Sequence, residues 1–222
     1  MLYWNTTNFR LKDTLDKLMS EDVLADFRLV GGTALSLQLG HRMSDDIDLF
    51  TDANYGSIDF GLIKEYLIKN FPYVSGDMGG NPGMGKSYLV GADDEDYVKV
   101  DIYYSMDPFF QPLVFEDNVR MATIEEITAM KVDIIQRKGR KKDFWDLHEL
   151  MEFYSIDQMI SLHATRFEYT HDKPLIITNF TDFSYADTFT DPTCLRGKRW
   201  GFIKQDFVEA LDRHRPGPGY TR

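Results

Sequence analysis

The 222-residue sequence has a single cysteine, no long apolar run and little positive charge. One cysteine, Cys194, excludes an intrachain disulfide and fits a reduced, cytoplasmic protein. No apolar run approaches the roughly 20 residues that cross a bilayer, so we expect no membrane segment. The first residues, MLYWNTTNFRLKD, do not have the basic and apolar regions of a signal peptide.

Positive charge is scarce because 25 Lys and Arg residues face 36 Asp and Glu residues, which gives a net charge of −11. Sequence-independent binding of nucleic acid depends on Lys and Arg that neutralise phosphates, so we expect no stable nonspecific DNA binding. The basic cluster at 137–142 (RKGRKK) fits either a local basic groove or a solvated helix end. The five histidines share no metal-ligand spacing, and we expect them to be structural or at the surface.

The most informative stretch is 30–50, VGGTALSLQLGHRMSDDIDLF. An apolar strand is predicted to end at Gly31 and Gly32, where the absence of a Cβ allows a tight turn and close approach to a ligand. The segment 33–39 is predicted to be a short helix, whose first N–H groups and dipole suit a phosphate. This combination favours a phosphate-binding turn.

Acidic and apolar residues alternate over 46–50, DIDLF. In a strand, this alternation puts Asp46 and Asp48 on one face and Ile47 and Leu49 on the other. Two neighbouring carboxylates are costly without a cation, and Mg²⁺ is commonly held by carboxylates together with substrate phosphates. The alternative is a core strand with two solvated acids. The preceding Gly-Gly-Thr turn and Ser44 favour the nucleotide site.

A third acid, Asp101, lies in a predicted strand on the face opposite Val100 and Ile102. A buried carboxylate needs a partner, which can be a basic side chain such as Lys99 or a metal ion. With Asp46 and Asp48 in the same chain, the metal is the favoured partner.

Residues 80–87, GNPGMGKS, match the Walker A pattern letter for letter. That motif requires a helix to begin at its last residue, whereas Ser87 is followed by two predicted strands with an acidic turn at 92–96. We therefore expect a loop that leads into a hairpin. A P-loop NTPase acting through Lys86 and Ser87 is the alternative, and Lys86→Ala would inactivate only that enzyme.

Apolar spacing and capping residues predict the remaining elements. Ser57 is expected to cap a helix, Thr123 and Glu126 to form a capping box, and Gly139 to end the helix that this box begins. The predicted helices are 5–20, 57–70, 123–139, 142–154, 156–163 and 201–213. Residues 71–75 are expected to be a strand, 175–177 a strand or packed loop, and 215–222 a frayed end.

Two side chains of the helical segments are candidates for function. Lys131 lies near the edge of an apolar helix face, where it could be a surface lysine with a buried stem or a phosphate contact. Asp143 lies near a predicted helix start, where it fits N-terminal capping equally well.

Four separated blocks resemble the AbiEii-type nucleotidyltransferases, toxins of abortive-infection toxin–antitoxin systems in the DNA polymerase β-like superfamily. The resemblance runs from about residue 28 to 150 and does not extend to the 80–87 loop or the C-terminal third. The blocks are GGTAL (31–35), HRMSDDIDLF (41–50), VKVDI (98–102), and AMK (129–131) with Arg137, Lys142, Asp143, Phe144, Asp146 and Leu147.

The resemblance implies that a nucleoside triphosphate (NTP) transfers its nucleotide to an acceptor hydroxyl and releases pyrophosphate. The acceptor would be RNA such as tRNA, or a protein, and a cognate antitoxin would be a partner. Metal-dependent transfer commonly uses two ions about 3.5–4 Å apart, here Mg²⁺ or Mn²⁺. The implied metal ligands are Asp46, Asp48 and Asp101; the implied nucleotide contacts are Gly31, Gly32, Thr33, Ser44 and Lys131; and Lys131 and Asp143 join the catalytic set.

The predicted fold is α+β, with a polymerase β-like core of mixed sheet and flanking helices and a mostly helical C-terminal part. We place the core at 1–120 and the helical lobe at 121–222, with a soft boundary that also allows one compact unit. The alternative function is a catalytically silent module of the same fold that binds a nucleotide or a partner. Three retained carboxylates argue against that alternative, because they are costly without a cation.

Overall fold

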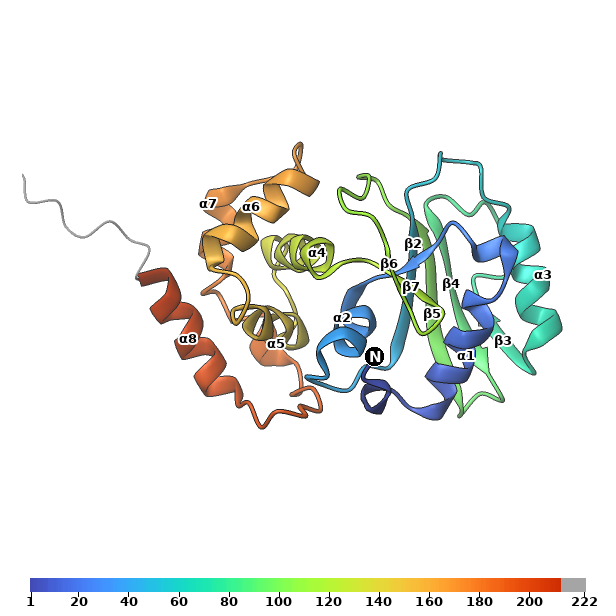
Figure 1. The fold of residues 1–222 in the computed structure, drawn as a ribbon, viewed down its shortest axis with the longest axis horizontal. Helices are drawn as coiled ribbons and strands as arrows, with labels where there is room; N and C mark the ends of the chain where they lie inside the picture. Colours follow the sequence, from blue (N-terminus) through green and yellow to red (C-terminus); the bar gives the residue numbers. More distant parts are fainter. Residues whose placement is uncertain (213–222) are drawn as a thin grey trace, which may run out of the picture. The chain divides into compact units, whose positions relative to one another are not determined.

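A computed structural model describes residues 1–212 and divides the chain into two units, Met1–Ile127 and a second that begins at Thr128 (Figure 1). The first unit contains a mixed sheet and the second is built from helices, so the α+β prediction is confirmed. None of the helices in the described part of the chain is long and apolar enough to cross a membrane.

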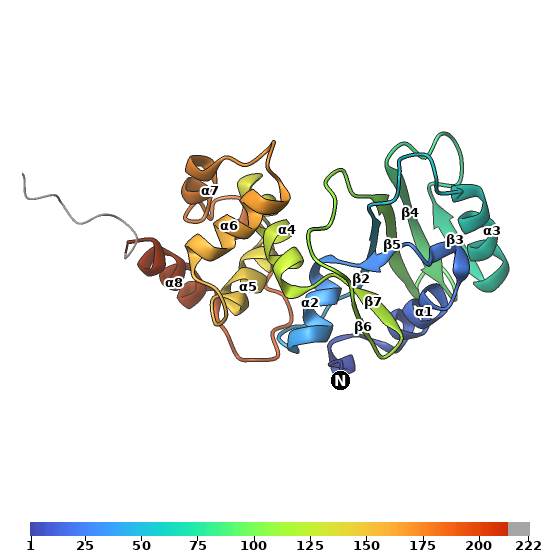
Figure 2. The same cartoon turned by 45° about the horizontal axis from the view of Figure 1, so that its top comes forward.

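The sheet of the first unit has seven strands among the described residues, in the order β3-β4-β5-β2-β1-β7-β6 (Figures 1 and 2). The pairs β2–β5 and β1–β7 are parallel, and the other neighbours are antiparallel. The strands are β1 (Arg28–Leu29), β2 (Asp46–Thr51), β3 (Tyr73–Gly76), β4 (Gly85–Gly91), β5 (Tyr97–Tyr104), β6 (Val114–Glu116) and β7 (Val119–Met121).

The helices of this unit pack against the sheet. Helix α1 contacts β2, β4 and β5, and α3 contacts β3 and β4. Strand alternation supplies the apolar partners, because Ile47 and Leu49 of β2 and Val100 of β5 are buried. The helices are the 3₁₀ turns η1 (Trp4–Thr6) and η2 (Asp22–Leu24), and α1 (Phe9–Met19), α2 (Gly31–Leu39) and α3 (Phe60–Asn70).

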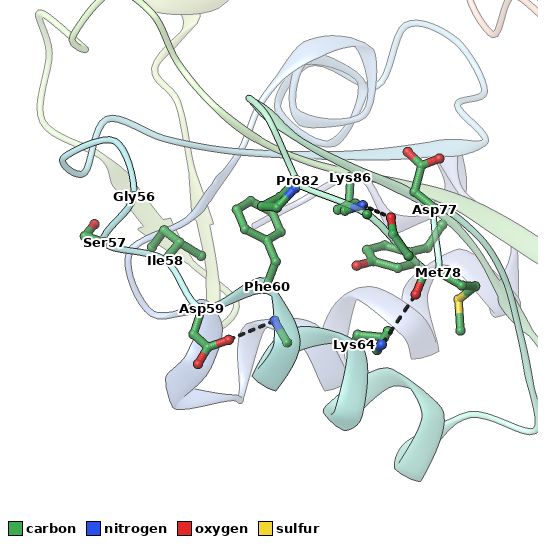
Figure 3. A pocket seen from close by; sticks show the side chains of 14 residues that line it. Gly56, Ser57, Ile58, Asp59, Phe60, Lys64, Asp77, Met78, Pro82 and Lys86 are labelled. Atoms are coloured by element: carbon green, nitrogen blue, oxygen red, sulfur yellow. Dashed lines mark hydrogen bonds between the residues drawn. The ribbon is translucent and has the colours of Figure 1, made fainter.

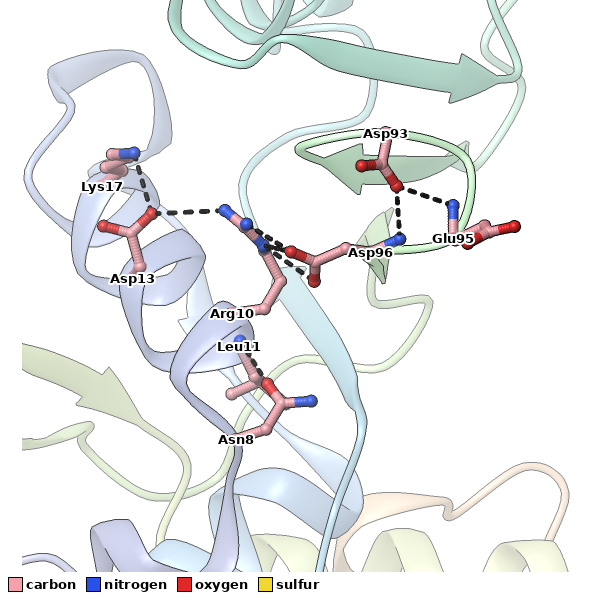
Figure 4. Close-up of polar contacts among 8 residues, drawn as sticks. All are labelled: Asn8, Arg10, Leu11, Asp13, Lys17, Asp93, Glu95 and Asp96. Carbon is pink, nitrogen blue, oxygen red and sulfur yellow. Dashed lines mark hydrogen bonds and ion pairs between the residues drawn. The ribbon is translucent and has the colours of Figure 1, made fainter.

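The predicted N-terminal helix and acidic turn are both present and contact each other (Figure 4). The Asn8 side chain accepts from Leu11 N and begins α1. Asp93 closes the β4–β5 turn by accepting from Asp96 N at 2.9 Å, and Arg10 of α1 donates to the Asp96 carboxylate at 3.1 Å. Because this pair is exposed to solvent, it contributes little to the stability of the fold.

The second unit contains five α-helices and a 3₁₀ turn among the described residues, the first helix continuing from the first unit. They are α4 (Ile124–Gln136), α5 (Lys141–Leu150), α6 (Ile156–Arg166), α7 (Lys173–Asn179), η3 (Ala186–Thr188) and α8 (Trp200–Asp212). Its core is aromatic: the ring of Phe144 lies 5.8 Å from Trp200 and 5.6 Å from Phe207, and Trp145 stacks on Trp200. Residues 213–222, with the predicted frayed end, lie outside the described residues.

Three local predictions are wrong. Helix α3 is capped by Asp59 rather than Ser57. Residues 175–177 lie in helix α7, because the Asp172 side chain caps that helix and Pro174 suits its first turn. The left-handed residue after α4 is Lys138, with φ of 65°, rather than Gly139. The predicted contact at the start of α4 is present, since Glu126 N donates to Thr123 Oγ1 at 3.3 Å.

Candidate functional site

The three predicted carboxylates lie on one face of two neighbouring strands. Parallel pairing places Asp48 of β2 opposite Asp101 of β5, and Asp46 opposite Lys99. Because side chains alternate along a strand, Asp46, Lys99, Asp48 and Asp101 share a face, and the buried Ile47 and Val100 point to the other. The strand pairing therefore joins two distant parts of the sequence into one acidic patch.

Lys99 supplies a positive charge within this patch. Its ammonium forms an ion pair with the Asp101 carboxylate, so the basic partner that was the alternative to a metal ion is present. Burial lowers the pKa of Lys99, but the hydrogen bond to Asp101 and the charges of Asp48 and Asp46 outweigh it and raise that pKa above its ordinary value. Lys99 thus acts as an internal counter-charge.

The donor set fits a divalent cation. Carboxylate oxygens are the ligands that Mg²⁺ prefers, and within residues 1–212 the buried Asp101 Oδ1 has no hydrogen-bond partner. In the same part of the chain, no three His, Cys, Asp or Glu side chains converge as a ready-made metal site. Binding of one ion by all three acids would therefore require them to approach one another.

The Gly-Gly turn lies directly against the acids. Gly31 has a φ of 69°, and a Cβ there would lie 2.6 Å from Asp48 Oδ2. Helix α2 begins at Gly31, two residues earlier than predicted, and Val30 before it provides no side-chain cap. The first N–H groups of α2 and the Asp48 carboxylate therefore lie next to each other, an arrangement suited to a metal-bound phosphate.

Thr33 and Ser44 hold this turn against β2. Thr33 Oγ1 lies 2.8 Å from Ser44 Oγ and also donates to the backbone carbonyl of Asp46. Ser44 N donates to Thr6 O at 2.9 Å. Both side chains are buried, so the described geometry gives them a positioning role. Their direct contact with a nucleotide stays a prediction.

Arg42 is a residue of this site that the sequence reasoning missed. Its side chain is only 2% exposed, and its guanidinium packs over Gly32, where an added Cβ would collide with Nη2. Nη1 donates to Met43 O at 2.9 Å. Its position in the HRMS segment could have drawn attention to Arg42, but no helix or strand periodicity predicts that an isolated arginine is buried. Gly32 is thus needed because a guanidinium occupies the space beside it.

Three further residues continue the acidic face and were also missed. Ser87 of β4 pairs in register with Asp101, and its Oγ lies 3.0 Å from the Tyr103 hydroxyl. The Tyr103 ring lies over Gly85 and has its centroid 6.2 Å from that of Phe50. The alternation of side chains along a strand predicts that these three residues lie on the acidic face only when the register between the strands is known.

Lys131 and Asp143 meet in the second unit. Lys131 Nζ lies 2.7 Å from Asp143 and 2.6 Å from Asp146, and all three side chains are buried. The interpretation of Lys131 as a surface lysine is therefore wrong. Asp143 also accepts from Arg140 N at 3.0 Å, which confirms its predicted capping role. Contact of Lys131 or Asp143 with the triphosphate stays a prediction.

The buried ion pair sets the ionisation of Asp143. Burial raises the pKa of this carboxyl, but the charge and hydrogen bond of Lys131 outweigh burial and hold the pKa below its ordinary value. Asp143 is therefore a carboxylate at neutral pH.

The Walker-like segment is a loop that leads into a strand, as expected. Gly85–Gly91 is β4 and pairs antiparallel with β5, so Ser87 begins no helix. Lys86 points to the face opposite Ser87 and Asp101. A P-loop arrangement is thereby excluded.

The sequence matches the family model described as nucleotidyl transferase AbiEii toxin, type IV toxin–antitoxin system, over residues 14–217. It is 31% identical to the uncharacterized protein aq_aa25 of Aquifex aeolicus (strain VF5) over 153 residues, which cover 66% of this chain and 68% of that protein.

Solved structures share the fold. MenT4, a nucleotidyltransferase toxin from Mycobacterium tuberculosis, has a TM-score of 0.58 at 15% identity, covering 91% of this chain and 82% of that one. JHP933 from Helicobacter pylori has a TM-score of 0.53 at 18% identity, covering 92% and 91%. The match of the family model across residues 14–217 establishes that the chain belongs to the AbiEii family of nucleotidyltransferase toxins.

Proposed function

We propose that this protein transfers a nucleoside monophosphate from an NTP to an acceptor hydroxyl, with Asp46, Asp48 and Asp101 as metal ligands. The observation that carries the proposal is the in-register pairing of Asp48 with Asp101, with Asp46 on the same face. Bound Mg²⁺ or Mn²⁺ would supply Lewis-acid stabilisation of the attacking and leaving oxygens. Within residues 1–212, Asp101 Oδ1 is buried and has no hydrogen-bond partner, which supports Asp101 as a metal ligand.

The protein's own groups bind and orient the reactants. The acceptor oxygen attacks the α-phosphorus, the bond to the bridging oxygen breaks, and pyrophosphate leaves from the Gly-Gly side. The first N–H groups of α2 would hold the triphosphate, because Gly31 lets the backbone approach Asp48. Asp101 would accept the proton of the attacking hydroxyl. Arg42, beside Gly32, would add positive charge near the phosphates.

We favour RNA as the acceptor because an aromatic pair adjoins the carboxylates. Phe50 and Tyr103 lie two residues along the strands from Asp48 and Asp101, on the same face. Aromatic rings beside a phosphate site stack unpaired bases, which a protein acceptor does not require. A cognate antitoxin, implied for a type IV toxin–antitoxin system, would be the natural inhibitor.

The test is transfer of label from each of four NTPs, with Mg²⁺, to total cellular RNA and to protein. We expect one nucleotide to label an RNA band, and Asp46→Asn or Asp48→Asn to reduce labelling at least about 100-fold while circular dichroism stays unchanged. Asp45→Asn is the matched control, because Asp45 is exposed and precedes the strand.

Full labelling by both strand variants would refute the assigned ligands. Labelled protein without labelled RNA would support nucleotidyl transfer but would show that the acceptor is a protein. NTP binding without any transfer would support the silent binding module instead.

A further inference from the structure

A cavity of about 490 Å³ lies beside β4 (Figure 3). Its walls come from the loop before α3, the first turn of that helix, and the glycine-rich loop that leads into β4. The volume is within the range of about 300–1,000 Å³ that is typical of small-molecule sites.

Strand alternation separates this cavity from the proposed transfer site. Ser87 faces Asp101, so its neighbours Lys86 and Tyr88 point to the other face of the sheet, where both line the cavity. A ligand in the cavity therefore does not contact the acidic face.

Two lysines converge at the cavity without an anionic partner. Lys86 Nζ donates to Gly79 O at 2.6 Å, and Lys64 Nζ to Met78 O at 3.4 Å, so both ammonium groups approach consecutive carbonyls of one loop (Figure 3). Lys86 is only 7% exposed, and within the described residues neither lysine forms an ion pair. Each ammonium has three donors, so both retain unused N–H groups.

The acids in the cavity wall are already used by the backbone. Asp59 accepts from Gly61 N and Leu62 N at the start of α3, and Asp77 accepts from Ser87 N at 3.1 Å. Both acids keep their negative charge, but within the described residues neither forms an ion pair with Lys64 or Lys86. An anion that bridges the two lysines would gain charge-assisted hydrogen bonds from both ammonium groups.

We propose that this cavity is a second ligand site, which binds a small organic phosphate. The phosphate group bridges Lys64 and Lys86, and the body of the ligand contacts the apolar side chains of Phe60 and Pro82, which line the same cavity. The glycine-rich loop contributes carbonyls that orient the lysines, rather than the N–H cradle of a Walker A loop. Binding here requires no divalent metal and is independent of nucleotidyl transfer.

The experiment is isothermal titration calorimetry of the full chain with AMP and with inorganic phosphate. Divalent metal is omitted and the protein carries Asp48→Asn, so that the proposed transfer site does not contribute. We expect AMP to bind more tightly than inorganic phosphate. Lys64→Met and Lys86→Met should each weaken AMP binding about tenfold or more, because each removes a charge-assisted hydrogen bond.

Lys69→Met is the matched control, since Lys69 lies on the same helix but outside the cavity, and it should leave the affinity unchanged. Lys86→Arg keeps the charge and should retain binding if Lys86→Met disturbs the loop. Unchanged affinity in Lys64→Met and Lys86→Met proteins, or no heat with millimolar AMP, would overturn the proposal. Equal affinities for AMP and inorganic phosphate would show that Phe60 and Pro82 do not contact the body of the ligand.

Discussion

At the residue scale, Lys99 holds the position in the acidic patch where a cation is most favourable. It lies opposite Asp46 across the strands and forms an ion pair with Asp101. A divalent ion that binds these carboxylates must therefore compete with an ammonium group that belongs to the protein. Such a counter-charge reduces repulsion between the acids before metal binds and weakens the apparent affinity for metal.

Replacing Lys99 with methionine should reverse both effects. We expect Lys99→Met to lower the melting temperature without divalent ions and to raise the affinity for Mn²⁺ by a factor of about three to ten. Solvent screening keeps this effect near 1 kcal/mol. Calorimetric titration with Mn²⁺ measures the affinity, and Lys99→Arg should behave as the unmodified protein. A weaker affinity in Lys99→Met would show that Lys99 supports the metal site instead.

Gly31 is the second critical residue, because its backbone conformation and its contact both exclude a side chain. Gly31→Ala should cost about 1–2 kcal/mol of stability from its positive φ. It should also lower nucleotidyl transfer at least about 100-fold, because the new Cβ displaces Asp48.

Gly56→Ala is the matched control for this prediction. Gly56 has a φ of 86°, and a Cβ there would meet nothing within 4 Å. It should show a similar loss of stability in chemical denaturation but full transfer activity. Equal transfer activity of the two variants would show that nucleotidyl transfer does not depend on the close approach of Gly31 to Asp48.

At the element scale, the Lys131–Asp143–Asp146 cluster joins α4 to α5 through buried charges. Breaking a buried pair leaves an uncompensated charge and typically costs about 3–5 kcal/mol. Lys131→Met should therefore strongly destabilise the protein in urea unfolding at pH 7. Lys173→Met is the control, since its pair with Asp157 is exposed, and it should change stability by less than about 1 kcal/mol.

The same cluster predicts a pH dependence. Because the folded-state pKa of Asp143 lies below its unfolded value, its ionisation contributes stability that is fully present above the unfolded pKa of about 4. That contribution is lost as the pH falls through the lower folded pKa. Asp143→Asn should be less stable than the unmodified protein at pH 7 and should lose less on acidification below pH ~4. Parallel stability curves for the two proteins would contradict the coupling.

The elements also show where sequence reasoning ends. Alternation in DIDLF and VKVDI correctly predicted two strands and their acidic faces, because that pattern is local. The pairing of β2 with β5, which brings Asp48 beside Asp101, depends on contacts between distant segments and could not be predicted from spacing. For the same reason Phe50, Ser87 and Tyr103 were not recognised as neighbours of the site.

Capping chemistry explains most of the local errors. The apolar run at 175–177 suggested a strand or packed loop, but the Asp172 cap and Pro174 start a helix there. Asp59 replaces Ser57 as the cap of α3 because its carboxylate accepts two N–H groups. Lys131 was misjudged because its burial depends on Asp143 and Asp146, which lie on the next helix.

At the scale of the whole molecule, a net charge of −11 constrains how the proposed RNA acceptor would be recognised. We expect weak binding with a shallow salt dependence, because few phosphates are neutralised. The slope of log K against log salt should be smaller in magnitude than about 3 for single-stranded RNA. Fluorescence anisotropy of a labelled oligonucleotide from 50 to 300 mM salt measures it. A steep slope would reveal an extended basic surface and contradict recognition mainly by stacking.

The parallel pairing of β2 with β5 also determines when activity appears during synthesis. Asp46 and Asp48 leave the ribosome early, but their partner strand follows only after the segment 52–96 has been made. Parallel strands require such a crossover, and non-local pairings form late in folding. A nascent chain shorter than about 104 residues therefore has no assembled carboxylate patch. The proposed transfer site is therefore incomplete while the first half of the chain is being translated.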